Sequence, residues 1–456
     1  MDLEGFARIL MREKGEKNGI LELAELISKI KNVDLGRAKK IAEAVFKEIK
    51  NAYSKSLPIL EYYRSDVKVG EFGVGCRGYG DYYVHKKISE LIEIKSELSP
   101  RDMDDAGVVK IGKWYISVSV DGIHSRLSEF PFISGFHVTR AAMRDIYVMG
   151  AEPIAVFSDI HIADDGDVSK IFDHVAGILA VCEVTKVPLV AGSTLRIGGD
   201  MVIGERMTGA VGCVGLSKFI TPRKNVKEGD VILLTEGAGG GTICTTAIYN
   251  GYHEIVYETI NLDFIKACKA IFKNNLLADI HSMTDVTNGG IRQDANEICR
   301  MSGKSLIFEY EKIRELVNKK VLKMLEELNI DFLGVSLDAL MIVCPENVSD
   351  DIKRVIRKAG VKIDEVGWVE TSDKPKPYLI FDGNKVELSQ KFRESAYTPI
   401  KKLVGEEKPR NFEKMKENID KAFEAALKKK KMVVKKLLGE LEFKTNFEAD
   451  FSLSEF

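Results

Sequence analysis

Residues 143–153 read Met-Arg-Asp-Ile-Tyr-Val-Met-Gly-Ala-Glu-Pro. They join a helical run over residues 137–149 to an apolar run over residues 153–160. Gly150 predicts the end of the helix, because glycine adopts the left-handed backbone of a helix C-terminus without strain. The second run predicts a strand. Asp145 therefore lies on a helix that leads directly into a sheet.

The segments on both sides of this junction also alternate between strands and helices. Residues 114–121 place their apolar side chains on one face, and Asp121 ends the predicted strand on its polar face. Downstream, residues 167–182 carry one apolar stripe at helical spacing, and residues 187–192 predict a buried strand. Together these elements predict one domain of about 150 residues.

A second domain begins near Ser217 and mixes strands with helices in the same way. Extended segments make up much of each half, so we predict the α+β class, with helices layered on sheets, rather than a doubly wound nucleotide-binding fold. The predicted elements are strand 231–235, a glycine loop over 237–242 followed by a helix, a turn over 284–290 that enters a helix, strand 339–344, helix 348–359 and strand 364–369.

Helical segments flank the two domains. Near the N-terminus, Asp34 can cap an amphipathic helix, and Pro58 ends the helical run. Residues 410–438 predict a similar helix, and the Lys428–Lys431 run beside its apolar face is either a solvated surface or a phosphate-binding patch. We therefore divide the chain into a helical extension (1–62), a first domain (63–216), a second domain (217–400) and a helical tail (401–456).

The composition favours a small-molecule partner. The 67 Lys and Arg residues nearly balance the 69 Asp and Glu residues, so the charge gives no reason to expect nucleic acid or a membrane surface. The seven cysteines form no C-x-x-C pair, which argues against a zinc ribbon or a disulfide framework and fits a reducing cytoplasm. No apolar run approaches the roughly 18 residues of a membrane span. Charged residues make up 30% of the chain, a feature of many thermophilic proteins.

A G-x-G-x-x-G sequence is formed by Gly73, Gly75 and Gly78. A dinucleotide-binding fingerprint requires a buried strand before it, and only a short extended segment precedes this one, so we do not assign a Rossmann site. The segment is either a mobile loop whose backbone closes over phosphates, with Arg77 adding positive charge, or a plain linker. Cys76 within it is either a nucleophile activated by Arg77 or a passive residue.

Four aspartates form the candidate metal set. Asp104 and Asp105 lie in a predicted loop, Asp121 ends a strand and Asp145 lies on a helix. Taken singly, each aspartate is commonly a cap or a solvated turn residue. Together they suit a hard cation, because Mg²⁺ takes oxygen ligands and usually bridges carboxylates to nucleotide phosphates.

Several segments over roughly residues 70–375 resemble, in the same order, the superfamily of aminoimidazole ribonucleotide (AIR) synthetase, selenophosphate synthetase, thiamine-monophosphate kinase and the hydrogenase-maturation dehydratase. Residues 103–107 are similar to the Asp-Asp-Ala-Ala element of the kinases, and residues 143–153 to the superfamily's Asn-Asp-x-x-x-Met-Gly-Ala-x-Pro helix. Residues 281–290, which include Asp285, resemble its Asp-x-Thr-x-Gly-Gly signature. The other matching segments are the strand end at 120–124, the turn at 191–194, the strand at 208–215 and the opening of the second domain at 229–233.

The resemblance implies an AIR synthetase-like fold, with an N-terminal sheet domain that dimerises into a barrel and a C-terminal α/β sandwich. It also implies a homodimer that binds ATP and Mg²⁺ in a groove lined by the four aspartates, with Gly192, Thr194 and the glycine loop near the nucleotide. The family chemistry is activation of an oxygen by phosphorylation, as in amide dehydration, ring closure or direct kinase transfer. We predict catalytic roles for Cys76, Arg77 and Asp285, on a small molecule or a protein-borne group.

Departures from the family pattern limit what the resemblance transfers. Ser193 replaces the acidic residue of a Gly-Gly-Asp/Glu-Thr turn, and Arg144 replaces the Asn before Asp145. Tyr79 stands where selenophosphate synthetases have a lysine, and the chain ends in Phe456 where the dehydratase has its acceptor cysteine. The chain is therefore an ATP-dependent enzyme of unidentified substrate, a nucleotide-binding regulatory or scaffold protein without turnover, or an unrelated α/β protein.

Overall fold

The computed structural model describes residues 1–394 and 397–444. The chain forms two compact units, each built from segments that are separate in the sequence. The first unit comprises Met1–Tyr63, Asp121–Val138 and Val156–Val211, and the second comprises Arg64–Val120, Thr139–Ala155 and the chain from Gly212 onward. Within the described residues, no helix combines the length and the apolar composition that crossing a bilayer requires.

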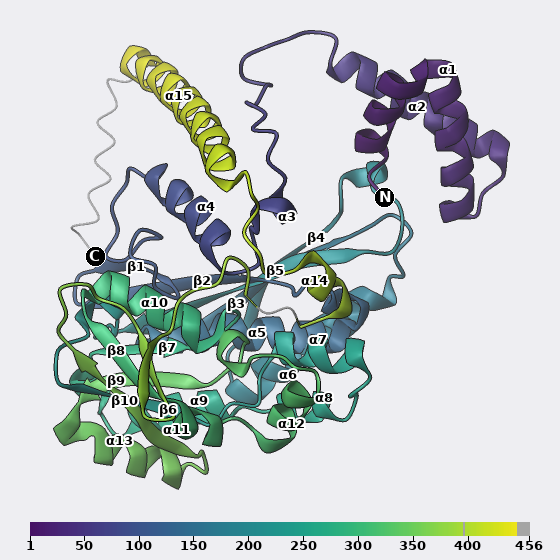
Figure 1. The fold of residues 1–456 in the computed structure, drawn as a ribbon. Helices are drawn as coiled ribbons and strands as arrows, with labels where there is room; N and C mark the ends of the chain where they lie inside the picture. The colour runs from purple at the N-terminus through teal and green to yellow at the C-terminus, as the bar shows by residue number, and fades with distance from the viewer. Residues whose placement is uncertain (395–396, 445–456) are drawn as a thin grey trace. The chain divides into compact units, whose positions relative to one another are not determined.

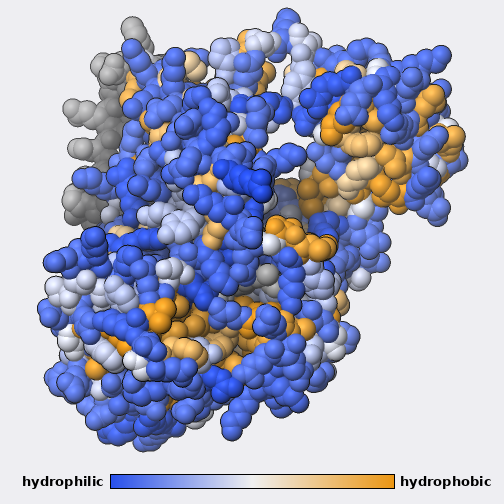
Figure 2. Space-filling view, in the orientation of Figure 1, coloured by the Kyte–Doolittle hydropathy of each residue, from blue (hydrophilic) through white to orange (hydrophobic). Residues whose placement is uncertain are grey.

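The N-terminal segment of the first unit is a helical module, as predicted (Figure 1). It consists of α1 (Leu3–Lys31), which is interrupted at Gly15, and α2 (Leu35–Ala52). The predicted cap is confirmed, because the Asp34 side chain accepts a hydrogen bond of 2.9 Å from the N–H of Arg37. Figure 2 shows hydrophobic residues gathered on the surface of this module. Its exposed apolar side chains include Ile9, Leu21, Ile30 and Leu35.

The rest of the first unit contains α6 (Ser169–Thr185), β4 (Leu189–Arg196) and most of β3 (Glu152–Ile162). Strands β3 and β4 pair in parallel, with Ile160 opposite Thr194. The predicted burial of the strand at 187–192 is wrong, because β4 is exposed along most of its length. β4 has only one strand neighbour in the five-stranded sheet, whose order is β1-β2-β5-β3-β4, so its apolar residues lie at a sheet edge.

The second unit contains most of the other elements expected around Gly150, but it shares three of them with the first unit, because the boundaries fall after Val120, Val138 and Val211. Strands β1 (Gly107–Ile111) and β2 (Trp114–Gly122) form an antiparallel hairpin, and β5 covers Met207–Ser217. The helix predicted over 137–149 is α5 (Pro131–Val148), which begins six residues earlier at a proline, a residue that suits the first turn of a helix. Gly150 follows it with a φ of +76°, as its role as a helix terminator requires.

A seven-stranded sheet forms the core of the second unit, in the order β12-β11-β8-β10-β6-β9-β7. Every residue of β6 is buried, as expected of a strand with neighbours on both sides. The strands are β6 (Asp230–Thr235), β7 (Ser282–Asp285), β8 (Ser305–Glu309), β9 (Leu340–Pro345), β10 (Ile363–Glu370), β11 (Tyr378–Phe381) and β12 (Asn384–Glu387). The helices are α7 (Gly241–Asn250), α8 (Ile255–Thr259), α9 (Asp263–Lys273), α10 (Gly290–Ser302), α11 (Tyr310–Glu315), α12 (Lys319–Glu327) and α13 (Glu346–Lys358), with short 3₁₀ turns η3 (Arg223–Asn225), η4 (Leu277–Asp279) and η5 (Phe332–Gly334).

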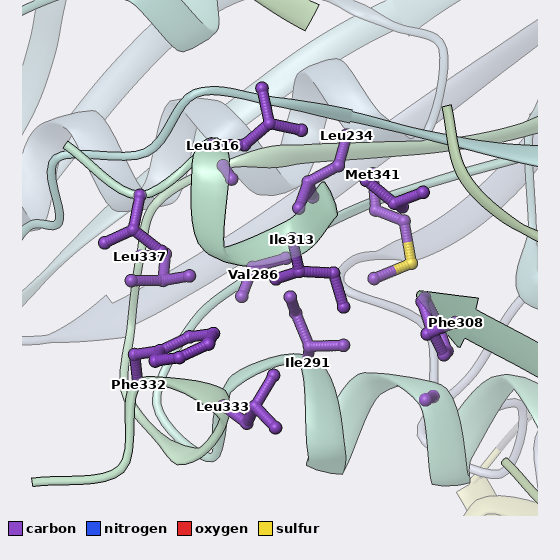
Figure 3. Close-up of a cluster of buried hydrophobic side chains, with 14 of the residues drawn as sticks. Leu234, Val286, Ile291, Phe308, Ile313, Leu316, Phe332, Leu333, Leu337 and Met341 are labelled. Atoms are coloured by element: carbon purple, nitrogen blue, oxygen red, sulfur yellow. The ribbon is translucent and has the colours of Figure 1, made fainter. Parts of the chain in front are cut away.

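One apolar cluster of this sheet anchors the loop that carries the predicted signature. Val286 directly follows β7, and Ile291 lies in the first turn of α10; both are fully buried (Figure 3). They pack in one cluster with Leu333 of η5 and Phe308 of β8. Because buried apolar residues flank residues 287–290, this loop has a fixed path.

Helices at the two ends of the second unit pack against each other. The N-terminal helices are α3 (Val69–Phe72) and α4 (Tyr79–Glu90), and the C-terminal helix that packs against them is α15 (Phe412–Lys444), which follows the short helix α14 (Pro399–Val404). The rings of Phe72 and Phe412 stack 5.0 Å apart, and Phe392 packs edge-on against Phe412. Within the predicted lysine run, Lys430 pairs with Glu93 at 3.1 Å, so this lysine contacts the chain beyond α4.

Candidate active site

The glycine loop over residues 73–78 connects α3 to α4. A helix rather than a strand precedes it, which excludes a dinucleotide-binding turn. The N–H groups of Gly75 and Arg77 donate to the Asp81 carboxylate at 2.8 and 3.2 Å. The N–H of Glu394 donates to the carbonyl oxygens of Cys76 and Arg77 at 3.1 and 2.9 Å. These two N–H groups of the loop thus have an acceptor in this conformation, and a role in phosphate binding stays a prediction.

A histidine and an aspartate lie next to this loop. His85 Nε2 is 3.3 Å from Asp81 Oδ1, and this hydrogen bond raises the pKa of His85. Burial acts to raise the pKa of Asp81, but hydrogen bonds from His85 and Gly75 outweigh it, and the pKa is lowered. Cys76 is half-buried, whereas the other six cysteines are buried. The exposed fraction thus distinguishes Cys76 from the other thiols of the chain.

The predicted signature is the loop from Asp285 to Gly290, between β7 and α10. Gly289 and Gly290 have φ angles of +102° and +62°, and a Cβ on Gly290 would clash with the carbonyl oxygen of Leu333. This explains the Gly-Gly pair. A Cβ on Gly289 would lie 3.2 Å from the Cβ of Arg77, so the glycine loop and the signature loop are neighbours.

Asp285 ends β7 in a fully buried position. Its Oδ2 accepts a hydrogen bond of 3.1 Å from Arg144 Nε, and its Oδ1 has no hydrogen-bond partner. Burial raises the pKa of Asp285 to about 7, although the guanidinium of Arg144 acts in the opposite direction. A buried carboxyl group that titrates near neutral pH and has a vacant oxygen is suited to accept a proton from a substrate.

Asp104 and Asp105 lie in the loop before β1, as predicted, and both contact Arg223 of η3. The N–H of Arg223 donates to Asp104 Oδ1 at 2.8 Å, and Arg223 Nη2 lies 2.6 Å from Asp105 Oδ1. Asp105 Oδ2 also accepts a hydrogen bond of 2.7 Å from the hydroxyl of Thr284, the residue before Asp285. Burial raises the pKa of Asp104 and of Asp105 to about 6, against the attraction of Arg223.

Helix α10 contributes two more carboxylates to Arg223. Asp294 Oδ1 lies 3.4 Å from Arg223 Nη2, and Glu297 forms an ion pair with Arg223 Nη1. Asp294 and Glu297 are three residues apart, so they lie on one face of the helix. Burial raises the pKa of Asp294 well above its ordinary value, and its Oδ2 has no hydrogen-bond partner.

Helix α5 supplies two arginines to the same unit. Arg140 and Arg144 both form ion pairs with Asp338, and Arg144 also pairs with Asp285. Arg140 additionally donates to the carbonyl oxygens of Thr259 and Asn261 at 2.8 Å each. Arg144, which departs from the family pattern in the sequence, is therefore a buried contact of the predicted catalytic aspartate.

These side chains form a buried network with more carboxylates than guanidinium groups. Asp104, Asp285 and Asp294 each have one buried oxygen without a hydrogen-bond partner. The excess negative charge requires protons or a bound cation. The carboxylates are Asp104, Asp105, Asp285, Asp294, Glu297 and Asp338, and the guanidinium groups are those of Arg140, Arg144 and Arg223.

The carboxylate oxygens of this network suit a Mg²⁺ ion that also binds the phosphates of a nucleotide. Across the side chains of residues 1–394 and 397–439, no three His, Cys, Asp or Glu residues are arranged to hold a metal ion. Mg²⁺ in nucleotide sites is usually bound by one or two carboxylates together with substrate phosphates, so a complete protein cage is not required. The vacant Asp104 Oδ2 is suited to such a contact.

The remaining predicted site residues are in several elements. Asp145 is half-buried on α5 in the second unit, whereas Asp121 belongs to the first unit and is also half-buried. Gly192 and Thr194 lie on the exposed strand β4 of the first unit. The metal role of the four aspartates and the nucleotide role of these two residues stay predictions.

The sequence reasoning missed five residues of the network, although some carried a signal. Arg140 and Arg144 are one helical turn apart on a helix that already contained Asp145, and Asp294 and Glu297 have the same relation on α10. Of these four residues, only Arg144 was singled out in the sequence, as a departure from the family pattern, and the residues missed were Arg140, Asp294 and Glu297. Arg223, Asp338 and the partners of each arginine lie far apart in the sequence, and no local pattern connects them.

The sequence matches one family over both of its domains. Residues 103–216 match the model described as AIR synthase related protein, N-terminal domain, and residues 227–380 match that of the C-terminal domain. An uncharacterized protein of Methanocaldococcus jannaschii is 51% identical over 451 residues, which cover 96% of this chain and 98% of the relative. A selenide, water dikinase of Aeromonas hydrophila is 27% identical over 254 residues, 52% of this chain and 69% of the relative.

Solved structures share the fold at low sequence identity. The complex of HypE with HypF matches with a TM-score of 0.56 and 17% identity, over 67% of this chain and 99% of the other. ThiL complexed with AMPPCP and TMP matches with a TM-score of 0.54 and 18% identity, over 71% and 98%. HypE in complex with ATP matches with a TM-score of 0.51 and 16% identity, over 72% and 96%.

Proposed function

Since the chain belongs to the AIR synthase-related family, we propose that it is an enzyme that uses ATP and Mg²⁺ to phosphorylate an oxygen of its substrate. The oxygen belongs to an amide, a carboxylate or a phosphate, on a small molecule or a protein-borne group. Structural relatives bound to ATP or AMPPCP support the choice of nucleotide. The observation that carries the proposal is the buried network around Asp285, which has surplus negative charge and vacant oxygens next to the glycine loop.

The proposed reaction is a direct transfer of the γ-phosphoryl group of ATP to the substrate. A substrate oxygen forms a bond to the γ-phosphorus of ATP, the bond from that phosphorus to the bridging β–γ oxygen breaks, and ADP leaves. When bound, Mg²⁺ neutralises the charge of the phosphates. Where the attacking group carries a proton, as an amide N–H or a hydrogen phosphate does, Asp285 accepts it, because its pKa of about 7 makes it an effective base near neutral pH.

The other residues of the network hold the reacting groups in place. Arg144 fixes the Asp285 carboxylate through Oδ2, and the buried Oδ1, which has no hydrogen-bond partner, is the atom that accepts the proton. Arg223 ties Asp104 and Asp105 to α10, so these carboxylates have a defined orientation before nucleotide binds. Asp121 and Asp145 complete the proposed set of metal ligands. Arg77 provides a positive charge at the glycine loop, next to the Gly289 backbone.

The proposal includes a homodimer that forms through the five-stranded sheet. On β2, Val118 and Val120 are 43% and 67% exposed, although both are apolar and lie on one face of the strand. Ile154 on β3 is 50% exposed. Strands that expose apolar residues in this way are typical of surfaces that a second chain covers. A second copy is the occupant that the family resemblance implies, and light scattering that finds a monomer in dilute solution would contradict it.

The test combines nucleotide binding with turnover. ATP with Mg²⁺ is expected to raise the melting temperature, because a ligand that binds only the native state stabilises it by about 2.7 kcal/mol at a hundredfold excess over Kd. Slow release of ADP by transfer to water should accompany binding. Asp285→Asn should bind ATP but release no ADP, whereas Asp350→Asn, on the exposed surface of α13, should behave as the wild type. The absence of a shift at millimolar ATP would reject the proposal, and binding without ADP from the wild type would favour a regulatory protein.

A further inference from the structure

A cavity of about 580 Å³ opens in the second unit, outside the network around Asp285. It lies where the end of β5, the turn η3, the turn η4 and the start of β2 meet. Its walls include Lys218, Lys224, Lys227, Phe219 and His281. The volume is within the range of roughly 300–1,000 Å³ that small-molecule sites occupy.

The polar side of this cavity is positively charged. Lys227 Nζ lies 3.1 Å from His281 Nε2, and His281 Nδ1 lies 2.8 Å from Asp230 Oδ2. An ammonium group can only donate, so Nε2 accepts and the imidazole is neutral, with Nδ1–H donating to Asp230. Lys224 has a carboxylate, that of Asp102, at 3.6 Å.

Two of these lysines lack a counter-charge. Within the described part of the chain, neither Lys218 nor Lys227 has a carboxylate within 4.0 Å. Two unpaired ammonium groups in one concave surface create a positive potential that favours a bound anion. The positive charge of these two lysines in the cavity is therefore not balanced by a neighbouring carboxylate.

The cavity lining also includes aromatic side chains. Phe219 is 51% exposed, and Tyr115 of β2 also lines the cavity. Lys218 Nζ lies 5.2 Å from the centroid of the neighbouring Trp114 ring, and Lys110 Nζ lies 5.1 Å from that of Tyr115. An exposed phenylalanine beside unpaired lysines suits a ligand with one planar apolar part and one anionic part.

From these observations we propose that the cavity is a binding site for a phosphate-bearing compound with a planar ring, of the size of a mononucleotide. Lys218 and Lys227 bind the phosphate, and Phe219 packs against the ring. This site is distinct from the proposed phosphoryl-transfer site. The two sites lie on either side of η3, because Lys224 faces the cavity while its neighbour Arg223 holds Asp105.

Tryptophan fluorescence tests the proposal directly. The chain has two tryptophans, so Trp368→Phe leaves Trp114 as the reporter. A phosphate that draws Lys218 away from the Trp114 ring should change its emission. The probes are AMP, which has both parts of the expected ligand, ribose 5-phosphate, which lacks the ring, and adenosine, which lacks the phosphate.

AMP is expected to give a saturable change, with the two partial probes binding at least about tenfold more weakly. Lys218→Ala and Lys227→Ala should each weaken AMP about tenfold, since each loses a charge-assisted contact, and Phe219→Ala should weaken AMP but not ribose 5-phosphate. Lys273→Ala, on the exposed surface of α9, is the matched control and should have no effect.

Two results would overturn the proposal. The first is the absence of a saturable change with AMP up to about 10 mM, where even a weak specific site would fill. The second is equal binding of AMP and ribose 5-phosphate that Phe219→Ala leaves unchanged, which would mean non-specific attraction of anions. The melting shift caused by ATP with Mg²⁺ should persist in Lys218→Ala, so a failure here is separate from a failure of the proposed function.

Discussion

Replacement of Arg223 by methionine tests the energetics of the buried network. The substitution preserves most of the side-chain volume but removes the charge that contacts Asp105, Asp294 and Glu297. Removing one partner of a buried ion pair usually costs about 3–5 kcal/mol, because the other charge remains buried without compensation. We expect Arg223→Met to lower the free energy of unfolding by about 4 kcal/mol at pH 8.

The decrease in the free energy of unfolding caused by Arg223→Met should become smaller as the pH falls. Burial already raises the pKa of Asp105 to about 6 with Arg223 in place, and removal of the guanidinium raises it further. In the variant, the native state then binds protons at a pH where the unfolded chain has released them, so its stability increases as the pH falls from 8 to 5. The difference between wild type and variant should decrease to roughly half over this range.

Guanidinium denaturation at pH 8 and pH 5 measures both effects. Trp114 and Trp368 both belong to the second unit, which contains the network, so their fluorescence follows its unfolding. Arg354→Met is the control, because Arg354 lies on the exposed face of α13 and pairs only with its neighbour Asp351 among the described residues. A loss below about 1 kcal/mol at pH 8, or an equal loss at both pH values, would refute the reasoning.

Three further predictions concern the loops of the site. Asp285→Asn should reduce phosphoryl transfer at least about a hundredfold without lowering the melting temperature, since burial already disfavours the ionised carboxylate and Arg144 keeps its ion pair with Asp338; steady-state ADP release and circular dichroism measure the two quantities. Gly290→Ala should destabilise by more than about 2 kcal/mol in chemical denaturation, because the new Cβ clashes with the Leu333 carbonyl, whereas Gly251→Ala, also at positive φ but in open space, should cost only about 1 kcal/mol. Equal costs would contradict the packing argument. In time-limited alkylation followed by mass spectrometry, Cys76 should be labelled before the six buried cysteines, and ATP with Mg²⁺ should slow its labelling; uniform labelling would remove the loop thiol from the account.

Local sequence patterns predicted the elements of the fold well. The helix that ends at Gly150, the cap at Asp34 and the strand beginning at Trp114 all depend on residues that are close together in the chain. The exposure of β4 could not be predicted in this way. Its apolar run is compatible with a buried strand, and only its place at the edge of the sheet decides its exposure.

The site was predicted less completely because its contacts are long-range. Asp104, Asp105 and Asp285 were identified as candidates, but the residues that hold them were not. Arg223 is 118 positions from Asp105, and Arg144 is 141 positions from Asp285. Arg144 departs from the family pattern at the position before Asp145. Its contact with Asp285 could not be predicted, because no local pattern connects residues so far apart in the sequence.

A crystal structure with AMPPCP and Mg²⁺ would show whether ATP and Mg²⁺ bind at the carboxylate network next to the glycine loop. We expect a metal ion about 2.1 Å from at least one carboxylate oxygen of Asp104, Asp105, Asp121 or Asp145. We also expect the γ-phosphate to lie on the side of the metal ion that faces the Asp285 carboxyl group. A nucleotide bound elsewhere, or phosphates and metal with no contact to these carboxylates, would contradict this expectation.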